Sequence, residues 1–507
     1  MTAHRGLTVA ACVLLAGTSA SAATVPEAVV LKGWPARVSG DAIAVAPDGT
    51  VTLQLTQGFA LDRRVQLAPL QGKSTTGNRQ TLAGLRPDGA LRFLYTSDPG
   101  CGNCDFGRPK VTFTASGRVQ AGANTLVDSN GVASIGSGEY LLGPNGERYR
   151  RDGRSFEVCV SGSPCWRYDP GYAPAGRDGQ DVGDRVAFAT NSGPVFIATT
   201  SDGNGSSGRL AVLDRATGVA LASRVLTNEP SGLWPDASGG VILSEIGPRS
   251  TAVERINASG VKRWRSEFQF GSLGDPGAPV VGPTGVYVPV QGAGSASGPD
   301  RVGTLALDLD GVTRWSISDR VPTAVEPDGT LITNAFFRTI EPGLLAVSPA
   351  DGRHRWSFPH RGNVAFGANG IVYLSSPEVG ATFALDPSRA RTPTRSTKIK
   401  LLHRVLATTD GTLAQLVFPS SASVYSLSIR PASGGSASNL FTGRLPGRGP
   451  EAGTRHFWAP VRLIGPGDGP LPRGRYVVSL TWLNYVAKGG KRTSRDQGLA
   501  TAQLTIR

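Results

Sequence analysis

The stretch of sequence that decides the fold is residues 306–315, which reads ALDLDGVTRW. A short apolar run leads into an Asp-Gly turn, and a tryptophan stands four residues after the glycine. The same plan recurs at residues 346–356, AVSPADGRHRW, and its first half recurs at residues 212–218, VLDRATG. A turn-forming glycine between two short apolar runs is typical of a β-hairpin. We therefore expect a chain built from repeated hairpins.

A second series of turns gives the repeat its length. Pro-Asp-Gly occurs at residues 47–49, 87–89 and 327–329, each before an apolar run. With looser versions, the series ends at Gly49, Gly89, Gly131, Gly193, Gly240, Gly285, Gly329 and Gly370. Neighbouring glycines are 40 to 47 residues apart, except for one interval of 62. Two hairpins in each period make four strands, so the spacing predicts a β-propeller, with eight blades expected and seven as the alternative.

Composition favours the same fold class. The chain has 507 residues with 67 Gly and 36 Pro, and only 18% of its residues are charged. Gly and Pro without a three-residue period exclude collagen, and their frequency disfavours long helices. Because 39% of the residues are hydrophobic and occur in short regular runs, a packed all-β protein fits better than a disordered chain.

Three tryptophans occupy one place in the repeat. Trp264, Trp315 and Trp356 stand four residues after Gly260, Gly311 and Gly352. A large aromatic ring at a fixed offset is expected to lie between blades and stack on the next sheet. These segments resemble the tryptophan-docking repeat of the PQQ-like β-propellers, over roughly residues 35–397. That family includes quinoprotein alcohol dehydrogenases and a non-catalytic propeller lipoprotein of outer-membrane assembly, so the resemblance implies a fold more specifically than an activity.

The early part of the chain departs from this pattern. Ala121, Arg150 and Ala222 stand where the repeat would have tryptophan. The interval of 62 residues holds about 20 extra residues around positions 155–184, which we interpret as an insertion. A hairpin closed by Cys159 and Cys165 and projecting from one face would fit it, and projecting loops often carry contacts. An insertion without a role is the alternative.

The N-terminus reads as an export signal. His4 and Arg5 precede an apolar run from Leu7 to Gly17, and small residues end at Ala22. This pattern predicts a signal peptide of residues 1–22 and a secreted, cell-surface or periplasmic protein. Val9-Ala10-Ala11-Cys12 resembles a lipobox, so lipidation is the alternative. No later run reaches the roughly 18–20 apolar residues of a membrane helix.

Four cysteines follow the signal: Cys101, Cys104, Cys159 and Cys165. An even number at short spacings in an exported chain favours two disulfides, most simply Cys101–Cys104 and Cys159–Cys165, among three possible pairings. A redox dithiol or half of a zinc site is the alternative for Cys101 and Cys104. A redox pair normally stands at a helix N-terminus, whereas this pair lies between strand-like runs, so a loop staple is the favoured interpretation.

The docking pattern stops near Lys398. Residues 398–507 contain short apolar runs separated by Gly/Pro turns, which predicts a small β-sandwich after a propeller of residues 23–397. The segment from Leu471 to Tyr476, LPRGRY, resembles a step into a strand that is common in Ig-like surface modules. Because Gly411 follows Gly370 by 41 residues, part of this region could instead complete a last blade.

Charge separates the two parts. Residues 398–507 hold 15 Lys/Arg and 4 Asp/Glu, a net charge of +11, whereas residues 23–397 hold 36 and 34. Such an excess favours association with polyanions. The predicted contacts are Arg473, Arg475, Lys488, Lys491, Arg492 and Arg495. Anionic envelope polymers, phosphate-bearing glycans and acidic lipids are the candidate partners, nucleic acid is not the expected one, and a solvated basic face without a partner is the alternative.

Catalytic patterns are lacking in the sequence. No His-Glu-x-x-His pair, Gly-x-Ser-x-Gly elbow, EF-hand spacing, Cys-Cys dipeptide or haem-attachment sequence occurs. His354 and His360 flank Trp356, where packing is a better interpretation than catalysis, and Asp308 and Asp328 read as turn formers. We therefore expect no catalytic residue, no metal and no cofactor.

The expected function is that of an exported binding or scaffold protein without enzymatic activity. One propeller face would bind an envelope protein or glycan, and the basic module would associate with anionic envelope material. The alternative is an enzyme with its site in the propeller funnel, either a quinoprotein oxidoreductase using PQQ with Ca²⁺ or a glycan-acting enzyme, whose paired carboxylates no sequence spacing would reveal.

Overall fold

The computed structural model describes most of the chain after the predicted signal, and every regular element in that part is a β-strand. The described residues are 25–40, 42–55, 81–96, 112–113, 118–121, 125–127, 133–135, 140–142, 147–152, 155–170, 186–189, 193–200, 208–236, 238–247, 250–269, 279–292, 301–336, 342–367, 370–391, 398–406, 412–419, 424–434, 438–444, 454–461, 471–488 and 491–507. The all-β prediction is therefore confirmed for these residues.

The first strands of the chain form four-stranded antiparallel sheets, called units here and numbered along the chain. Unit 1 is β2 (Ala42–Val45), β3 (Val51–Gln54), β4 (Thr81–Leu85) and β5 (Leu91–Thr96). Unit 2 is β6 (Thr112–Phe113), β7 (Val119–Ala121), β8 (Thr125–Val127) and β9 (Ala133–Ile135). Unit 3 is β10 (Leu141–Leu142), β11 (Arg148–Asp152), β12 (Ser155–Cys159) and β13 (Trp166–Tyr168).

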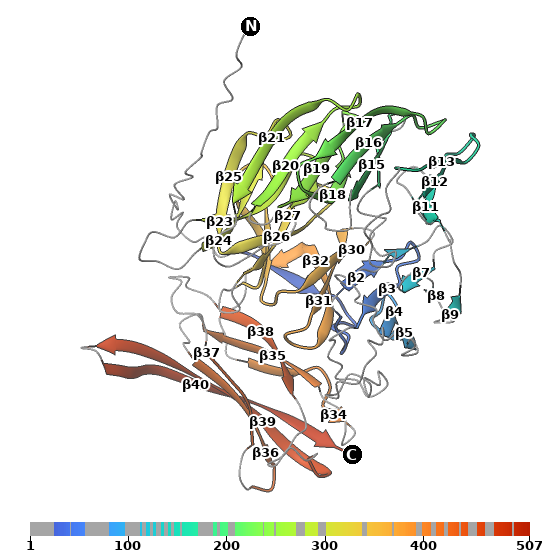
Figure 1. Ribbon diagram of the computed structural model, residues 1–507. Helices are drawn as coiled ribbons and strands as arrows, with labels where there is room; N and C mark the ends of the chain where they lie inside the picture. The colour runs from blue at the N-terminus through green and yellow to red at the C-terminus, as the bar shows by residue number, and fades with distance from the viewer. Residues whose placement is uncertain are drawn as a thin grey trace.

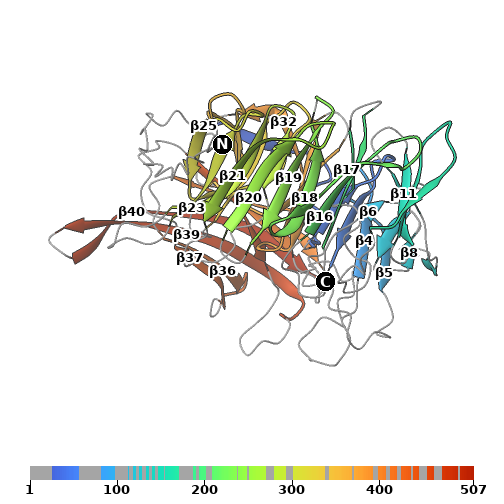
Figure 2. The same cartoon turned by 45° about the horizontal axis from the view of Figure 1, so that its top comes forward.

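The middle units have longer strands. Unit 4 is β14 (Val186–Phe188), β15 (Val195–Thr200), β16 (Gly208–Leu213) and β17 (Ala220–Leu226). Unit 5 is β18 (Glu229–Pro235), β19 (Val241–Ile246), β20 (Ser250–Ile256) and β21 (Lys262–Gln269). Unit 6 is β22 (Val280–Gly282), β23 (Gly285–Gly292), β24 (Arg301–Leu307) and β25 (Thr313–Ser318). Figure 2 shows β18 to β21 side by side, with β16 and β17 of the preceding unit beyond them.

The last two units share a strand from the N-terminus. Unit 7 is β26 (Arg320–Val325), β27 (Leu331–Ala335), β28 (Leu344–Val347) and β29 (His354–Phe358). Unit 8 is β30 (Asn363–Phe366), β31 (Val372–Ser376), β32 (Ala381–Arg391) and β1 (Glu27–Val30). β1 pairs antiparallel with β32 and meets β29 in parallel at Glu27 and Ser357, so the two units form one eight-stranded sheet. The last unit is thus completed by β1 and not by the region around Gly411.

Hydrophobic cores lie between consecutive units and not within them. Phe156 and Val158 of unit 3 pack with Phe188 and Ile197 of unit 4. The same kind of cluster joins units 4 and 5, 5 and 6, 6 and 7, and 7 and 8. Tyr373 and Ala384 of unit 8 share a cluster with Val51, Leu53 and Ala83 of unit 1, which brings the two ends of the series together. This arrangement of four-stranded sheets is consistent with a β-propeller.

The first third of the series differs from the sequence-based assignment. Gly89 lies in the β4–β5 turn, so it ends unit 1 and does not begin a new unit. Gly131 falls outside the described residues, in the chain segment between β8 and β9, and unit 3 has no glycine in the predicted series. The prediction was wrong because the long connection between β3 and β4 places the two turn glycines of unit 1, Gly49 and Gly89, one expected period apart.

The predicted insertion is also corrected by the structure. Cys159 ends β12, and Trp166 begins β13 just after Cys165, so the cysteine-bearing hairpin is half of unit 3 and not an addition to it. The proposed tryptophan replacements Ala121 and Arg150 lie in β7 and β11, which are second strands of their units and not outer strands. The insertion and the tryptophan positions were both assigned wrongly because units 2 and 3 are short. Together they span little more than one expected period.

The C-terminal module contains two sheets. A three-stranded sheet is β33 (Lys398–Leu401), β35 (Thr412–Pro419) and β38 (Thr454–Val461). A five-stranded sheet has the order β34 (Val405–Leu406), β40 (Lys491–Ile506), β39 (Gly474–Lys488), β36 (Val424–Pro431) and β37 (Ser438–Arg444). Both sheets contribute to one core, in which Leu401 and Leu416 of the first pack with Leu427, Val478 and Leu480 of the second.

The module is attached to unit 8 through its three-stranded sheet. Leu413 of β35 is fully buried in the cluster that contains Phe383 and Leu385, and Leu402 packs against the same cluster. Figure 1 shows β35 and β38 between units 1–8 and the strands β36 and β39 of the five-stranded sheet. One face of that sheet therefore covers the module core, and the other faces away from the repeats.

Candidate functional site

The tryptophans of the repeat lie at seams between units. The Trp264 indole of unit 5 donates a hydrogen bond to the Leu309 carbonyl of unit 6 over 2.8 Å, and its ring lies against Gly311. A Cβ atom at Gly311 would be only 2.8 Å from that ring, and Gly311 has a φ of 80°, so both space and conformation require glycine. Trp315 of unit 6 repeats this contact, donating to the Pro349 carbonyl over 3.0 Å beside Gly352.

Trp356 lies deeper than the other two. It is 4% exposed and belongs to the core between units 7 and 8 with Phe358 and Phe383. At the seam before Trp264, Gly260 meets the Ala222 side chain at 2.9 Å, so the alanine does occupy the position of the docking ring there.

Two docking tryptophans were missed by the sequence analysis. Trp166 of unit 3 donates to the Arg215 carbonyl over 2.9 Å and lies against Gly218. Trp34, just after β1, donates to the Pro87 carbonyl over 3.0 Å beside Gly89. The sequence shows the Thr217-Gly218 turn, but the tryptophan that contacts it, Trp166, stands about 50 residues earlier. Trp34 lies outside any repeat that the sequence shows.

The structure contains one of the two predicted disulfides. Cys159 and Cys165 are bonded, with Cα atoms 4.1 Å apart, and they close the β12–β13 hairpin directly before Trp166. Cys101 and Cys104 lie outside the described residues, so their pairing stays a prediction.

The seam between units 4 and 5 carries ion pairs in place of a ring. Glu245 and Glu254 are almost fully buried on β19 and β20. Arg265 of β21 bonds to Glu245 and lies 3.4 Å from Glu254, while Arg224 of β17 reaches across from unit 4 to Glu254. Burial lowers the pKa of Arg224, although nearby Glu245 opposes this shift. With every carboxylate held by a guanidinium, this cluster is suited to fastening two sheets rather than to proton transfer.

A different ion pair recurs at the Pro-Asp-Gly turns. Arg92 of β5 bonds to Asp48 over 2.7 Å, and Arg355 of β29 bonds to Asp328 over 2.8 Å. Each aspartate also accepts the backbone N–H two residues on, which is how an aspartate stabilises a tight turn. Burial opposes ionisation of Asp328, but the Thr330 hydrogen bonds and Arg355 outweigh it and lower its pKa. These residues therefore read as clips that tie the first hairpin of a unit to its last strand.

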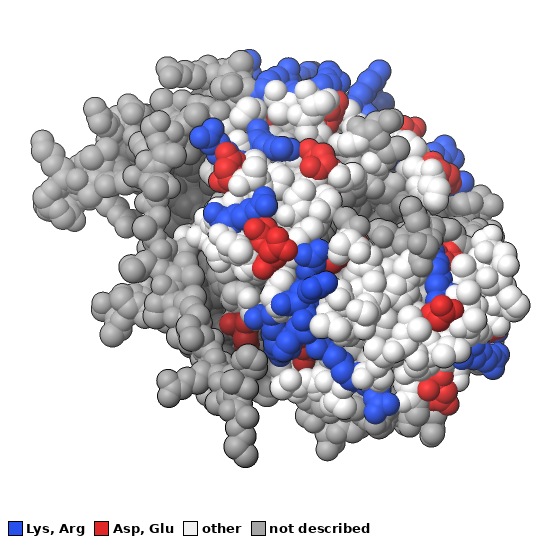
Figure 3. All heavy atoms as spheres, turned by 90° about the horizontal axis from the view of Figure 1, so that it is seen from above, with Lys and Arg blue, Asp and Glu red and all other residues white. Residues whose placement is uncertain are grey.

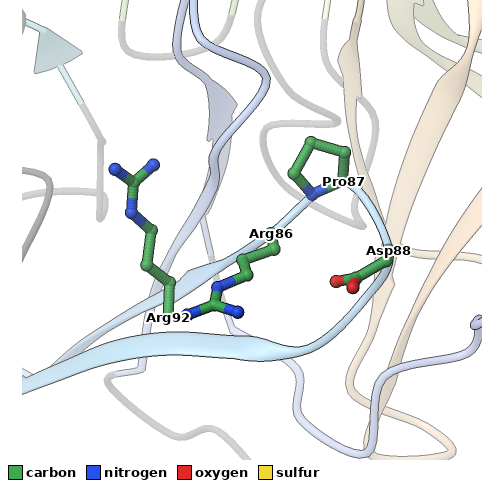
Figure 4. Close-up of a pocket in the computed structure, with 4 residues that line it drawn as sticks. All are labelled: Arg86, Pro87, Asp88 and Arg92. Atoms are coloured by element: carbon green, nitrogen blue, oxygen red, sulfur yellow. The ribbon is translucent and has the colours of Figure 1, made fainter.

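One open pocket adjoins such a clip. It has a volume of about 640 Å³ and is lined by Arg86, Pro87, Asp88 and Arg92 (Figure 4). The Asp88 carboxylate points to the side of the turn where Arg86 lies, but it accepts the Ala90 N–H over 3.0 Å. Arg92 is held by Asp48, so Arg86 is the one lining cation that forms no ion pair among the described residues. This is a shallow basic surface more than an enclosed site.

Charges of both signs are mixed on the repeat region. Figure 3 shows, from above, a band of Lys and Arg side chains across the middle of the described surface, with Asp and Glu side chains beside it. The mixture agrees with the near balance of basic and acidic residues over positions 23–397. No strong field of one sign is expected from this part of the molecule.

The first strands of several units contact one another, as strands around an axis would: β2 with β30, β14 with β18, β22 with β26 and β26 with β30. Their described side chains are mostly aliphatic; Glu229, Arg320 and Asn363 begin β18, β26 and β30. Arg320 donates to the Pro342 carbonyl over 2.6 Å, and burial lowers its pKa to about 10. The described side chains of these first strands include one carboxylate, that of Glu229, and one amide, that of Asn363.

The described histidines give no sign of a metal site. His354 is exposed on β29, whereas His360 is fully buried between Phe358 and Phe383, where burial lowers its pKa to about 3. Among the described residues, no group of three His, Cys, Asp or Glu side chains could hold a metal ion. The described part of the chain also contains no helix with the length and apolarity needed to cross a bilayer.

The predicted polyanion contacts fall into two separate places. Arg473 and Arg475 are exposed beside and at the start of β39. Lys488 ends β39 and pairs with Lys491 at the start of β40, with Arg492 and Arg495 further along that strand. At roughly 3.3 Å per residue, Arg475 and Lys488 are about 40 Å apart along the long hairpin seen in Figure 1. The side chains of the second set lie outside the described residues.

A further arginine joins the first set through the sheet register. Arg430 of β36 is exposed and pairs with Val477 of β39, so its side chain is on the same face as Arg475, one diagonal step away. No ion pair involves Arg430, Arg473 or Arg475 among the described residues. No pattern in the sequence points to Arg430, because strand pairing alone places it there.

No protein-family model matches the chain, and no curated protein matches it. Solved structures show weak similarity. A rhamnogalacturonan lyase is 12% identical over 91% of this chain and 89% of that chain, with a TM-score of 0.30. Quinohemoprotein alcohol dehydrogenase from Comamonas testosteroni is 12% identical over 73% and 72%, with a TM-score of 0.29. A chimera of ACO and RPE65 is 11% identical over 73% and 93%, with a TM-score of 0.35. At these values none of them defines the function of this chain.

Proposed function

We propose that the chain is an exported two-part protein, in which units 1–8 are the eight blades of a PQQ-like propeller and the C-terminal module is an Ig-like β-sandwich. The cores between consecutive units and the closing contact of unit 8 with unit 1 support the ring. The Tyr476 hydroxyl donates to the Pro472 carbonyl over 2.8 Å, as in the tyrosine corner of Ig-like sandwiches, which supports the second part. Residues 1–22 would be the export signal.

In this proposal the protein binds without catalysing a reaction. The module holds the protein on anionic envelope material, while one face of the propeller binds an envelope protein or glycan. The observation that carries the proposal is the exposed set Arg430, Arg473 and Arg475 on a module with a net charge of +11. Guanidinium groups recognise carboxylate and phosphate with paired hydrogen bonds, and a concentrated positive charge attracts polyanions at long range.

The way the module is attached determines where its arginines point. Leu413 is buried between the three-stranded sheet and unit 8, so the arginines on the outer face of the five-stranded sheet face away from the propeller. A polymer bound there would leave the propeller surface accessible to a second partner. The two halves of the proposed function are therefore compatible in one molecule.

The test compares full-length variants on anionic cell-wall material across a series of salt concentrations. We expect Arg430→Gln/Arg473→Gln/Arg475→Gln to elute at clearly lower salt than the unchanged protein, because fewer counterions are released on binding. Lys262→Gln/Arg263→Gln/Arg389→Gln is the matched control, since it removes three exposed cations from the repeat region. Equal elution of both variants, or retention that does not depend on salt, would contradict the proposal.

A further inference from the structure

The outer face of the five-stranded sheet has a regular pattern of polar side chains. Leu427, Ile429, Val478, Leu480 and Leu504 point into the module core, so the alternate residues of β36, β39 and β40 point outward. Strand register arranges these outward residues in rows across the three strands: Ser426–Thr481–Leu499, Ser428–Ser479–Thr501 and Arg430–Val477–Gln503, with Arg475 beside Thr505 at the end. We call this set the hydroxyl face.

The rows provide hydrogen-bonding groups at a fixed spacing. Neighbouring strands are about 4.8 Å apart, and successive rows follow at about 6.7 Å, so the groups form a nearly flat grid. Thr481, Thr501 and Gln503 are exposed, and Ser428 and Ser479 are half-buried. A hydroxyl can both donate and accept, as can the Gln503 amide. The Thr481 hydroxyl donates to the Ser426 carbonyl over 3.4 Å, so it meets a ligand as an acceptor. Such a grid suits a ligand that itself carries many hydroxyl groups.

Charge at one end of the grid restricts the ligand further. Arg430 and Arg475 stand on the hydroxyl face, with Arg473 just before β39. No carboxylate belongs to the outward residues of these rows. A guanidinium beside hydroxyl groups matches a sugar chain that bears carboxylates, since acid groups and sugar hydroxyls then meet complementary partners together.

Other polyanions match this surface less well. Single-stranded nucleic acids are held by aromatic side chains that stack on bases, and the outward residues of these rows include no aromatic residue. A lipid surface favours a helix or loop with a large apolar side, whereas Val477 and Leu499 are the apolar members of this set. A phosphate polymer without sugars would use the arginines but leave the hydroxyl rows without a function.

We propose that the hydroxyl face binds an acidic polysaccharide, whose sugar hydroxyls meet the Ser/Thr/Gln rows and whose carboxylates meet Arg430 and Arg475. This inference rests on the proposed function, because it names the site and the ligand class of the same module. It adds a requirement that charge alone does not contain, namely that the neutral hydroxyl rows contribute to affinity.

The experiment measures dissociation constants of the full-length protein at one salt concentration for three probes: alginate, polyphosphate and phosphatidylglycerol vesicles. The row variant Ser479→Ala/Thr501→Val/Gln503→Met keeps the charge and removes hydrogen-bonding groups. We expect it to weaken alginate binding about tenfold and to change polyphosphate binding less than twofold. The control Ser223→Ala/Thr313→Val/Ser316→Ala, on exposed positions of β17 and β25, should change neither.

Each result decides between the two proposals. Unchanged alginate binding by the row variant would overturn the polysaccharide inference, even if Arg430→Gln/Arg475→Gln weakens binding and so supports the charged anchor. Tighter binding of polyphosphate or vesicles than of alginate would also overturn it. If neither the row variant nor Arg430→Gln/Arg475→Gln weakens alginate binding, the proposed function itself is contradicted. Thr501→Glu, a single exposed change that repels carboxylates, gives a second test if the row variant does not fold, and it should weaken alginate binding at least tenfold.

Discussion

Two seams of the repeat region solve one packing problem in different ways. Between units 5 and 6, the Trp264 ring lies on Gly311 and donates to the next unit. Between units 4 and 5, Ala222 occupies the place of the ring, and Arg224 and Arg265 hold two buried glutamates instead. The difference shows that the repeat fixes the geometry of a seam but not its chemistry.

The two solutions should respond differently to mutation. An indole seam is held by dispersion and apolar burial, which decline gradually as atoms are removed. A buried ion pair returns little net stability while complete, yet removing one partner leaves an uncompensated charge. The charged seam is therefore expected to be the more sensitive one.

Arg265→Ala tests this sensitivity and should have the largest effect. Glu245 is fully buried and Glu254 is 1% exposed, so both would lose a neutralising group. We expect the free energy of unfolding to fall by about 4 kcal/mol, as measured by urea denaturation. Arg263→Ala, at an exposed neighbouring position of β21, is the control and should change it by less than about 0.5 kcal/mol. A loss smaller than that of Trp264→Ala would break the comparison.

Trp264→Ala should follow, with a loss of about 3 kcal/mol, because a large side chain and its hydrogen bond to Leu309 are both removed. Trp264→Phe keeps most of the apolar contact and isolates the hydrogen bond, so its loss should be about 1 kcal/mol. Urea denaturation of both variants under one set of conditions gives the ratio. Equal losses would mean that the ring contributes little beyond its N–H group.

The disulfide next to Trp166 should have a smaller effect. Closing the short loop between Cys159 and Cys165 restricts the unfolded chain by about 2 kcal/mol. Cys159→Ala/Cys165→Ala should therefore lower the midpoint of thermal unfolding, and reducing agent should lower that midpoint further in the unchanged protein than in the variant. A response of equal size in both proteins would contradict a stabilising role of this bond, and a response that remains in the variant would point to the predicted Cys101–Cys104 bond.

The closing strand gives a pH-dependent effect. Burial raises the pKa of Glu27 to about 8, and Arg391 opposes this. The folded state thus binds the proton more tightly than the unfolded chain, so stability present below pH 4.5 is lost as the pH rises towards 8. Glu27→Gln should stabilise the protein at pH 9, where the buried carboxylate is charged, and have no effect at pH 4, where it is protonated in both the folded and the unfolded chain. An equal effect of Glu27→Gln on urea denaturation at both pH values would exclude this explanation.

The later repeats could be predicted from the sequence because their turns are regular. The turn that contains Asp308 and Gly311 recurs with a tryptophan at constant spacing. Each of these residues acts within its own turn, so a short stretch of sequence is enough to reveal the repeat. Trp34 and Trp166 escaped because their partners Pro87 and Arg215 are about 50 residues away. Gly89 was assigned to the wrong hairpin because a turn glycine looks the same in the first and second hairpins of a unit.

The candidate site was predictable only in part. Composition identified the basic module, and the turn before Tyr476 drew attention to Arg473 and Arg475. Arg430 and the hydroxyl face depend on which residues of β36, β39 and β40 stand opposite one another, and no local pattern encodes a register between strands 50 residues apart. The same register separates Lys488 and its neighbours from the arginines with which the sequence had grouped them.

The place of β1 governs the order of events during folding. Val29 and Val30 of β1 pair with Asp386 and Leu385 of β32, and Gly40, which follows β1 in the chain, bonds to Ser375 across 335 residues. The strand is made among the first of all but finds its partners only after β31 and β32 exist, so ring closure is a late, long-range step and folding should be slow. Until then β1 carries unpaired backbone groups and adjoins unburied apolar surface on unit 8, which leaves the newly synthesised chain prone to aggregation.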